Sequence, residues 1–251
     1  MLPRARRSVL YMPGSNSRAI AKARELPVDA LILDLEDAVS PEAKRDARIT
    51  VCEAVSAGGF GRREVVIRIN AMASEWGEDD LAAAAAVRPD AILLPKVCAP
   101  ADVLRASERL QREPAGKVIA LWAMIETPLA ILRAGEIAAA GAGLAALVMG
   151  TNDLAKELRC DGRAGLGFAL SQGVLAARGF GLGAIDGVFN SIADLAGFEA
   201  ECREARALGF DGKTIIHPTQ IEAANRSFSP FPAEIAWAES VVATFARAEN
   251  Q

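Results

Sequence analysis

Eight short apolar segments recur along the chain, and helical patterns lie between them. The segments cover residues 8–12, 30–35, 64–69, 91–97, 118–125, 144–150, 183–189 and 213–218. Uninterrupted apolar runs are typical of strands that are covered on both faces, as in parallel sheets. Eight β-then-α units in 251 residues predict an α/β fold of the (β/α)₈ TIM-barrel type. A doubly wound open sheet is the alternative, because the number of strands does not prove that the sheet closes.

Prolines at helix starts support this alternation. Helices are expected over residues 41–57, 100–112, 128–140 and 194–209, and the first three begin with proline. Residues 230–251 have the pattern of one further amphipathic helix. Because no proline- or serine-rich linker divides the chain, we expect one domain over residues 1–251, a barrel with a C-terminal helical extension.

Composition narrows the class of protein. With 51% hydrophobic and 24% charged residues the chain is globular, and a net charge of −4 without a long basic block argues against nucleic acid as a partner. No apolar run reaches about 18 residues, so no membrane partner is expected. The basic cluster at residues 3–8 precedes no long apolar stretch and is not a secretory signal. Four widely spaced cysteines and a single histidine argue against zinc and favour free thiols in the cytoplasm.

Charged residues follow three of the apolar runs. Glu126 and Asp153 each fall at or just past the end of a predicted strand, and Arg68 lies at the end of another. In parallel α/β folds, the carboxyl ends of the strands are where active sites are built. Two carboxylates from neighbouring strand ends, with room for water and substrate, suit Mg²⁺. The pattern indicates a metal enzyme that acts on a carboxylate or keto acid.

Structural roles are the alternatives for these residues. Glu126 and Asp153 are also placed to stabilise helix N-termini. Arg68 would need a partner anion if buried, and we expect Glu126 or Glu36 to supply it in the absence of substrate. Asp37, beside Glu36, suits either the site or a helix start.

Other polar residues near strand ends are weaker candidates. Lys96 and Asp186 also lie at predicted strand ends, where they are candidates to line the pocket. The turn and helix start at residues 12–23 carry Arg18 and Lys22, which with Arg7 could bind phosphates, although a plain Ser/Asn helix cap explains the same pattern. His217, the only histidine, is expected to be structural.

Eight motifs in order give the chain a resemblance to a known family. They are RRSVLYMPG (6–14), LDLEDAV (33–39), VIRIN (66–70), LLPKV (93–97), MIETP (124–128), GTNDLAKEL (150–158), AIDGV (184–188) and GKTIIHPTQI (212–221). Together they resemble the citrate lyase β-subunit-like branch of the HpcH/HpaI aldolase family, from about residue 6 to about residue 245. The resemblance implies a (β/α)₈ barrel, a homotrimer or homohexamer, and Mg²⁺-dependent cleavage or formation of C–C bonds in acyl-CoA hydroxy acids.

The resemblance also assigns roles. It implies that Glu126 and Asp153 bind the metal and that Arg68 holds substrate oxygens and the enolate. It implies that Glu36 and Asp37 orient the arginine and the metal's water ligands. The loop before Arg18 and Lys22 corresponds to one that approaches CoA, and Arg7 is the third CoA candidate.

We therefore expect a Mg²⁺-dependent lyase acting on an acyl-CoA hydroxy acid such as citryl-CoA, malyl-CoA or citramalyl-CoA, with a 2-keto acid such as oxaloacetate as product or substrate. Alternatives are an aldolase on free hydroxy-keto acids, an acyl-CoA thioesterase and a non-catalytic subunit of a lyase complex. The chain departs from the family at Gln172 and Gly173, where an arginine and a larger apolar residue are common. Related lyases often carry a further C-terminal segment with an acidic group, and we expect that group to be absent or to come from elsewhere.

Overall fold

The strands form a closed parallel barrel. The computed structural model describes residues 4–112, 116 and 118–246. The strands are β1 (Ser8–Pro13), β2 (Ala30–Asp34), β3 (Glu64–Arg68), β4 (Ala91–Leu94), β5 (Ala120–Ile125), β6 (Leu144–Met149), β7 (Gly183–Asp186) and β8 (Gly212–Ile215). Each strand pairs with the next in parallel, and β1 also pairs with β8, with Val9 beside Thr214. The predicted TIM barrel is confirmed, and the open sheet is excluded.

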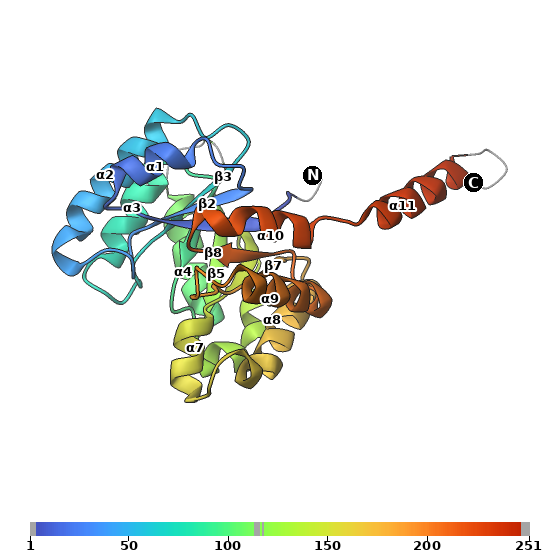
Figure 1. Ribbon diagram of the computed structural model, residues 1–251. Helices are drawn as coiled ribbons and strands as arrows, with labels where there is room; N and C mark the ends of the chain where they lie inside the picture. Colours follow the sequence, from blue (N-terminus) through green and yellow to red (C-terminus); the bar gives the residue numbers. More distant parts are fainter. Residues whose placement is uncertain (1–3, 113–115, 117, 247–251) are drawn as a thin grey trace.

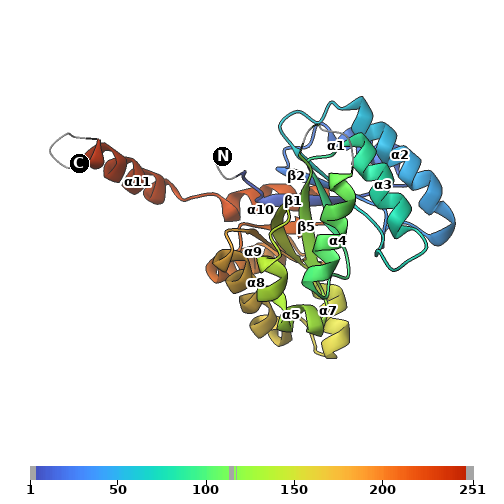
Figure 2. The ribbon, with the colours of Figure 1, turned by 180° about the vertical axis from the view of Figure 1, so that it is seen from behind.

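Helices surround the barrel (Figures 1 and 2). The α-helices are α1 (Ser17–Ala23), α2 (Lys44–Ala57), α3 (Gly77–Val87), α4 (Pro100–Gln111), α5 (Pro128–Leu132), α6 (Ala134–Ala139), α7 (Thr151–Leu158), α8 (Gly167–Gly179), α9 (Leu195–Leu208), α10 (Ile221–Phe228) and α11 (Pro232–Phe245). The 3₁₀ turns among the described residues are η1 (Pro41–Ala43), η2 (Arg163–Leu166) and η3 (Pro218–Gln220). No helix in the described part of the chain is long and apolar enough to span a membrane.

The helix boundaries differ from the predicted ones by more than one residue in three places. The helix expected over 41–57 begins with the 3₁₀ turn η1, and α2 starts only at Lys44. The helix expected over 128–140 is two helices, because Arg133 leaves the α conformation with φ −106° and ψ 10°. The helix expected over 230–251 is α11, and residues 247–251 lie outside the described residues.

Side chains alternate between two apolar cores. Ile32, Val66, Trp122 and Val148 belong to the cluster inside the barrel. Their strand neighbours belong to the larger cluster between the strands and the helices. A position's parity along its strand therefore decides whether its side chain faces the barrel axis or the helical layer.

Arginines of the N-terminal segment lie at the amino ends of the strands. Arg6 makes two hydrogen bonds to Glu64, of 2.8 and 2.9 Å, and its guanidinium lies 4.8 Å from the ring centroid of Trp122. Arg4 pairs with Asp90 at 3.1 Å. The basic cluster is thus neutralised within the fold, at the end of the barrel opposite to the carboxyl ends of the strands.

Helix α11 projects away from the barrel (Figures 1 and 2). None of its residues is buried, and Trp237 and Val242 are each 69% exposed. Arg206 of α9 holds its first turn through a 2.7 Å contact with Glu234.

Candidate active site

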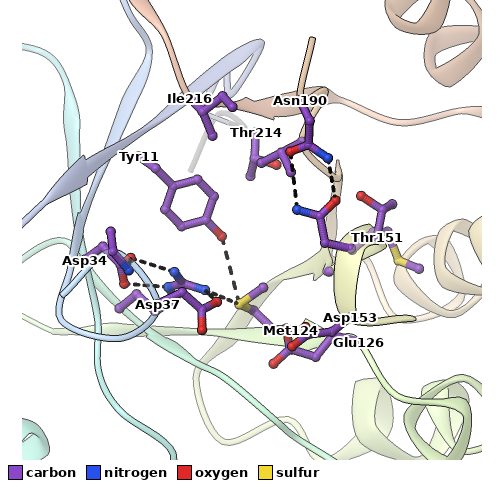
Figure 3. Close-up of a pocket in the computed structure, with 16 residues that line it drawn as sticks. Tyr11, Asp34, Asp37, Met124, Glu126, Thr151, Asp153, Asn190, Thr214 and Ile216 are labelled. Atoms are coloured by element: carbon purple, nitrogen blue, oxygen red, sulfur yellow. Dashed lines mark hydrogen bonds and ion pairs between the residues drawn. The ribbon is translucent and has the colours of Figure 1, made fainter. Parts of the chain in front are cut away.

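A cavity of about 270 Å³ opens at the carboxyl ends of the strands (Figure 3). It brings together Arg68 at the end of β3, Glu126 just past β5 and Asp153 in the first turn of α7. The lining residues are Tyr11, Asp34, Asp37, Ala38, Arg68, Met124, Glu126, Met149, Gly150, Thr151, Asn152, Asp153, Val188, Asn190, Thr214 and Ile216. The acid pair and the arginine therefore face one space.

Arg68 is anchored by Asp34, a partner that sequence reasoning missed. The Arg68 Nε and Nη2 atoms each donate to one Asp34 carboxylate oxygen, both at 2.6 Å. The expected partners were Glu126 or Glu36. Glu36 Oε2 does lie 2.8 Å from Nη1, whereas the structure describes no ion pair between Arg68 and Glu126. Two of the guanidinium nitrogens are thus fixed, and Nη1 faces Glu36 and Asp37, whose Oδ2 atom is 3.1 Å away.

Backbone groups fix Asp34 in turn. Its two carboxylate oxygens accept hydrogen bonds from the main-chain nitrogens of Glu36 and Ala38, at 2.9 and 3.0 Å. The ring of Tyr11, the only tyrosine, lies 4.8 Å from the Arg68 guanidinium carbon. A buried arginine whose Nε and Nη2 atoms are both held by Asp34 is a preorganised positive charge.

Burial perturbs the acids around Arg68. It raises the pKa of Glu36 to about 7, against the opposing effect of Arg68. Burial likewise raises the pKa of Tyr11, so that its phenol stays protonated. Glu36 is therefore a carboxyl group that can hold or release a proton near neutral pH.

Glu126 is seated by its neighbours. Its side chain is almost fully buried, and Oε1 accepts a 2.6 Å hydrogen bond from the main-chain nitrogen of Lys96. Burial raises the pKa of Glu126, while the hydrogen bond and the charge of Lys96 act in the opposite direction. Gly150 leaves the space that this carboxylate needs, because a Cβ there would lie 2.6 Å from Glu126 Oε2.

Lys96 lies against the acid pair. Its Nζ atom is in contact with Asp153 Oδ2 and 3.6 Å from Glu126 Oε1. The residue has a left-handed backbone, with φ 53°. The two carboxylates thus already hold a positive charge between them.

The acid pair fits a hard divalent cation. It offers two carboxylates around a position that accommodates a positive group, and carboxylate oxygens are the ligands that Mg²⁺ prefers. Among the described residues, no group of three His, Cys, Asp or Glu side chains could hold a metal. An ion bound at Glu126 and Asp153 would need water and substrate as its other ligands.

The first turn of α7 offers hydrogen-bond donors to the cavity. Gly150 at its N-cap supplies no side-chain cap, and Thr151 Oγ1 is buried and has no hydrogen-bond partner among the described residues. Asn152 and Asn190 exchange amide hydrogen bonds of 2.8 and 3.3 Å beside it. A helix start with unsatisfied donors suits a substrate carboxylate.

Asp186 does not belong to the cavity, so its pocket-lining alternative is wrong. It is fully buried and contacts Lys213 Nζ at 2.7 Å and Arg163 Nη1 at 3.1 Å. Its neighbour Ile185 faces the barrel axis, so the alternation of β7 turns Asp186 towards α9.

The phosphate-binding candidates do not lie together. Arg7 pairs with Asp29 at 2.8 Å just before β1, at the amino end of the barrel. Arg18 and Lys22 are exposed on α1, which starts at the opposite end. Asn16 caps this helix by accepting from Ala19 N at 3.0 Å, as the plain-cap alternative has it.

Two further residues have structural roles. His217 caps η3 through its Nδ1 atom, which accepts from Thr219 N at 3.3 Å, the kind of role expected for it. Gly173 of α8 packs on Met149, because a Cβ would lie 2.5 Å from its sulfur. The departure at Gly173 thus reaches a residue that lines the cavity.

Comparisons with known proteins agree with this architecture. Residues 7–218 match the HpcH/HpaI aldolase/citrate lyase family. The chain is 47% identical to a (3S)-malyl-CoA thioesterase of Cereibacter sphaeroides, over 97% of this chain and 84% of the relative. The chain therefore belongs to the HpcH/HpaI aldolase/citrate lyase family, and it is an enzyme of the citrate lyase β-subunit-like branch.

Solved structures include complexes with small molecules. The citrate lyase beta subunit from Mycobacterium tuberculosis, complexed with oxaloacetate and magnesium, has a TM-score of 0.77 and 30% identity, covering 90% of this chain and 98% of that one. The CitE protein of the same organism, in complex with magnesium, acetoacetate and coenzyme A, has a TM-score of 0.77 and 28% identity, covering 98% of this chain and 92% of that one.

Proposed function

We propose that this protein is a Mg²⁺-dependent enzyme whose substrate is the CoA thioester of a hydroxy acid, of the malyl-CoA type. It breaks either the thioester C–S bond or a C–C bond of this substrate. The observation that carries the proposal is the joint placement of Arg68, Glu126 and Asp153 around one cavity of about 270 Å³. The (3S)-malyl-CoA thioesterase that is 47% identical supports this substrate class, and the magnesium complexes support the metal.

The residues divide the substrate between them. Glu126 and Asp153 would hold the ion, which when bound supplies a Lewis acid for the hydroxy-acid oxygens. The first turn of α7 receives the free carboxylate. Arg68, held in place by Asp34, directs Nη1 at the thioester oxygen and stabilises the negative charge that develops there. Glu36 holds or accepts the proton that this reaction moves, because its pKa is raised to about 7.

Hydrolysis is the first candidate reaction, because a thioesterase is 47% identical over 97% of this chain. A water oxygen forms a bond to the acyl carbon, the C–S bond breaks, and the CoA sulfur takes the proton that the water loses. The products are a free hydroxy acid such as malate and CoA.

C–C cleavage is the second candidate, and the oxaloacetate and acetoacetate complexes favour it. The substrate hydroxyl loses its proton, the C–C bond breaks to leave a 2-keto acid, and the electron pair becomes a thioester enolate beside Arg68. Protonation of the enolate gives acetyl-CoA. We propose that Arg18 and Lys22 on the exposed face of α1 contribute to CoA binding in either reaction, whereas Arg7 is engaged at the other end of the barrel.

Product analysis separates these reactions. The protein is incubated with (3S)-malyl-CoA and Mg²⁺, with a matched sample in EDTA. Malate and a free thiol indicate hydrolysis, whereas glyoxylate and acetyl-CoA indicate C–C cleavage. A parallel sample contains a free 4-hydroxy-2-keto acid in place of the thioester. Release of pyruvate from this acid, without turnover of malyl-CoA, would favour the CoA-independent aldolase. Absence of every product would overturn the proposed function and favour a non-catalytic subunit.

We also propose that the chain forms a homo-oligomer, a trimer or hexamer, in which α11 packs on a second copy. Trp237 and Val242 of α11 are exposed, and Leu132 and Phe168 on the α5–α8 side are 75% and 73% exposed. Light scattering tests this. We expect an oligomeric mass that falls when Trp237 and Val242 are both replaced by serine, and a monomeric parent protein contradicts the proposal.

A further inference from the structure

Lys96 reaches the acid pair twice. Its main-chain nitrogen donates to Glu126 Oε1 at 2.6 Å, while its ammonium group contacts Asp153 and lies 3.6 Å from the same Glu126 oxygen. The first contact belongs to the backbone and persists whatever the side chain does. The second depends on a flexible side chain.

The backbone at Lys96 is in a conformation that non-glycine residues rarely adopt. Its φ is 53°, in the left-handed region. Such strain persists only where the surroundings enforce it, and it concentrates at functional sites. Here the left-handed turn directly after β4 places both the N–H group and the ammonium group on the acid pair.

Charges around the cavity leave Lys96 as the counter-ion of this pair. Arg68 is committed to Asp34 by two hydrogen bonds. The ion pairs described for Glu126 and Asp153 are all made with Lys96. The Lys96 side chain is 36% exposed, so the ammonium group has a path to solvent.

We propose that Lys96 is a tethered counter-ion of the metal site. Its ammonium group neutralises Glu126 and Asp153 in the metal-free protein and is displaced when a divalent cation binds. Two positive groups cannot share these carboxylates without mutual repulsion, so the ammonium group lowers the affinity for the metal. This inference rests on the proposed metal site, and it adds that Lys96 limits how tightly that site binds the metal.

Metal binding measured without turnover tests the proposal. Mn²⁺ is titrated by calorimetry into the parent protein and into Lys96→Met, which keeps the backbone donor and removes the charge. We expect Lys96→Met to bind Mn²⁺ more tightly, by about 5- to 150-fold, the range of ordinary coupling between two ligands. The melting temperature of the metal-free protein should fall, and that of the Mn²⁺-saturated protein should not.

Two further variants keep the result interpretable. Lys96→Arg retains the charge and should bind Mn²⁺ no more tightly than the parent. Lys156→Met removes a charge three residues beyond Asp153 on the exposed side of α7, and should leave the affinity within about 2-fold if only direct contact matters. If Lys96→Met does not fold, Lys96→Gln replaces it.

The outcomes separate this inference from the proposed function. Mn²⁺ binding that is equal or weaker in the neutral Lys96 variant overturns the tethered counter-ion and leaves the metal site standing. Absence of Mn²⁺ binding in both the parent and the neutral variant overturns the metal site as well.

Discussion

Asp34 and Arg68 occupy paired positions on neighbouring strands, and their side chains form a bidentate ion pair inside the carboxyl end of the barrel. The register of β2 and β3 sets Asp34 beside Arg68, and both hydrogen bonds measure 2.6 Å. Ile32 and Val66 lie two residues earlier on the same strands, and both face the barrel axis. Because side chains alternate along a strand, Asp34 and Arg68 face the axis as well. The sheet itself therefore orients the guanidinium.

This pair makes Arg68→Lys a test of geometry. The variant keeps the positive charge, but lysine has a single side-chain nitrogen. It cannot bond both Asp34 carboxylate oxygens and also offer a further nitrogen to the substrate. We expect turnover to fall about 10²-fold or more, the effect of losing one oxyanion donor, while Mn²⁺ affinity is unchanged. Steady-state kinetics and calorimetry measure the two quantities.

Arg68→Met is the companion to that variant. It leaves the carboxylate of Asp34 buried without its partner, and removing one member of a buried pair typically costs about 3–5 kcal/mol. Normal turnover in Arg68→Lys together with a large loss of stability would show that Arg68 is only a structural ion pair.

Glu36 should make stability depend on pH. Its pKa is raised by burial from 4.5 to about 7, so the folded protein binds more protons than the unfolded chain between these values. The free energy of unfolding therefore falls as pH rises through this window. Glu36→Gln should remove up to about 3 kcal/mol of this dependence, given about 1.4 kcal/mol per pKa unit.

Urea unfolding at pH 5 and pH 8 measures this effect. The raised pKa of Glu126 acts in the same direction but is present in both proteins, so it cancels in the comparison. An identical pH dependence in parent and variant would contradict the assignment to Glu36.

Strand parity shows how much of the site was predictable. The eight apolar runs predict the barrel, and the carboxyl-end rule predicts the cavity of Arg68, Glu126 and Asp153. Whether a residue faces the barrel axis or the helices depends on its position along the strand, and to predict this the strand bounds must be known to within one residue. The sequence pattern did not define the bounds so closely. This alternation is what turns Asp34 inward and Asp186 outward, to the helix side of β7.

Lys96 was harder to place for a different reason. Its direction depends on a left-handed backbone just after β4, and no glycine or asparagine marks that turn in the sequence. The position of Arg7 depends likewise on Asp29, a partner 22 residues away. Local sequence patterns therefore did not predict the ion-pair partners that are distant in the sequence, nor the unusual backbone conformation at Lys96.

Glu126→Gln tests the metal site directly. The amide oxygen can still accept the hydrogen bond from Lys96 N, so the fold should be retained while the negative charge is lost. Changes beside a metal ligand alone cost about 10- to 100-fold in affinity, and we expect at least this loss for Mn²⁺ by calorimetry. Glu42→Gln, on the exposed turn η1, is the control with the same chemical change. Equal Mn²⁺ affinity in both variants would remove Glu126 from the site.

Gly150→Ala asks whether the seat of Glu126 is as tight as the structure indicates. The backbone at this position has φ −91° and ψ 74°, so the strain of the new methyl group comes mainly from contact. Its Cβ would lie 2.3 Å from Glu126 Cβ and 2.6 Å from Oε2, which forces the carboxylate to move. We expect Mn²⁺ affinity to fall about 10-fold or more, the scale of disturbing a ligand's support.

Gly135→Ala in α6 is the matched control, because no described residue outside its own stretch of helix lies within 4 Å of the new Cβ. Alanine in a helix should stabilise this variant by about 0.5–1 kcal/mol and leave Mn²⁺ affinity unchanged. Thermal unfolding of the metal-free proteins accompanies the titrations, so that a loss of fold is distinguished from a loss of the site. If Gly150→Ala binds Mn²⁺ as the parent does, then Glu126 has room to shift and its seat does not set the metal affinity.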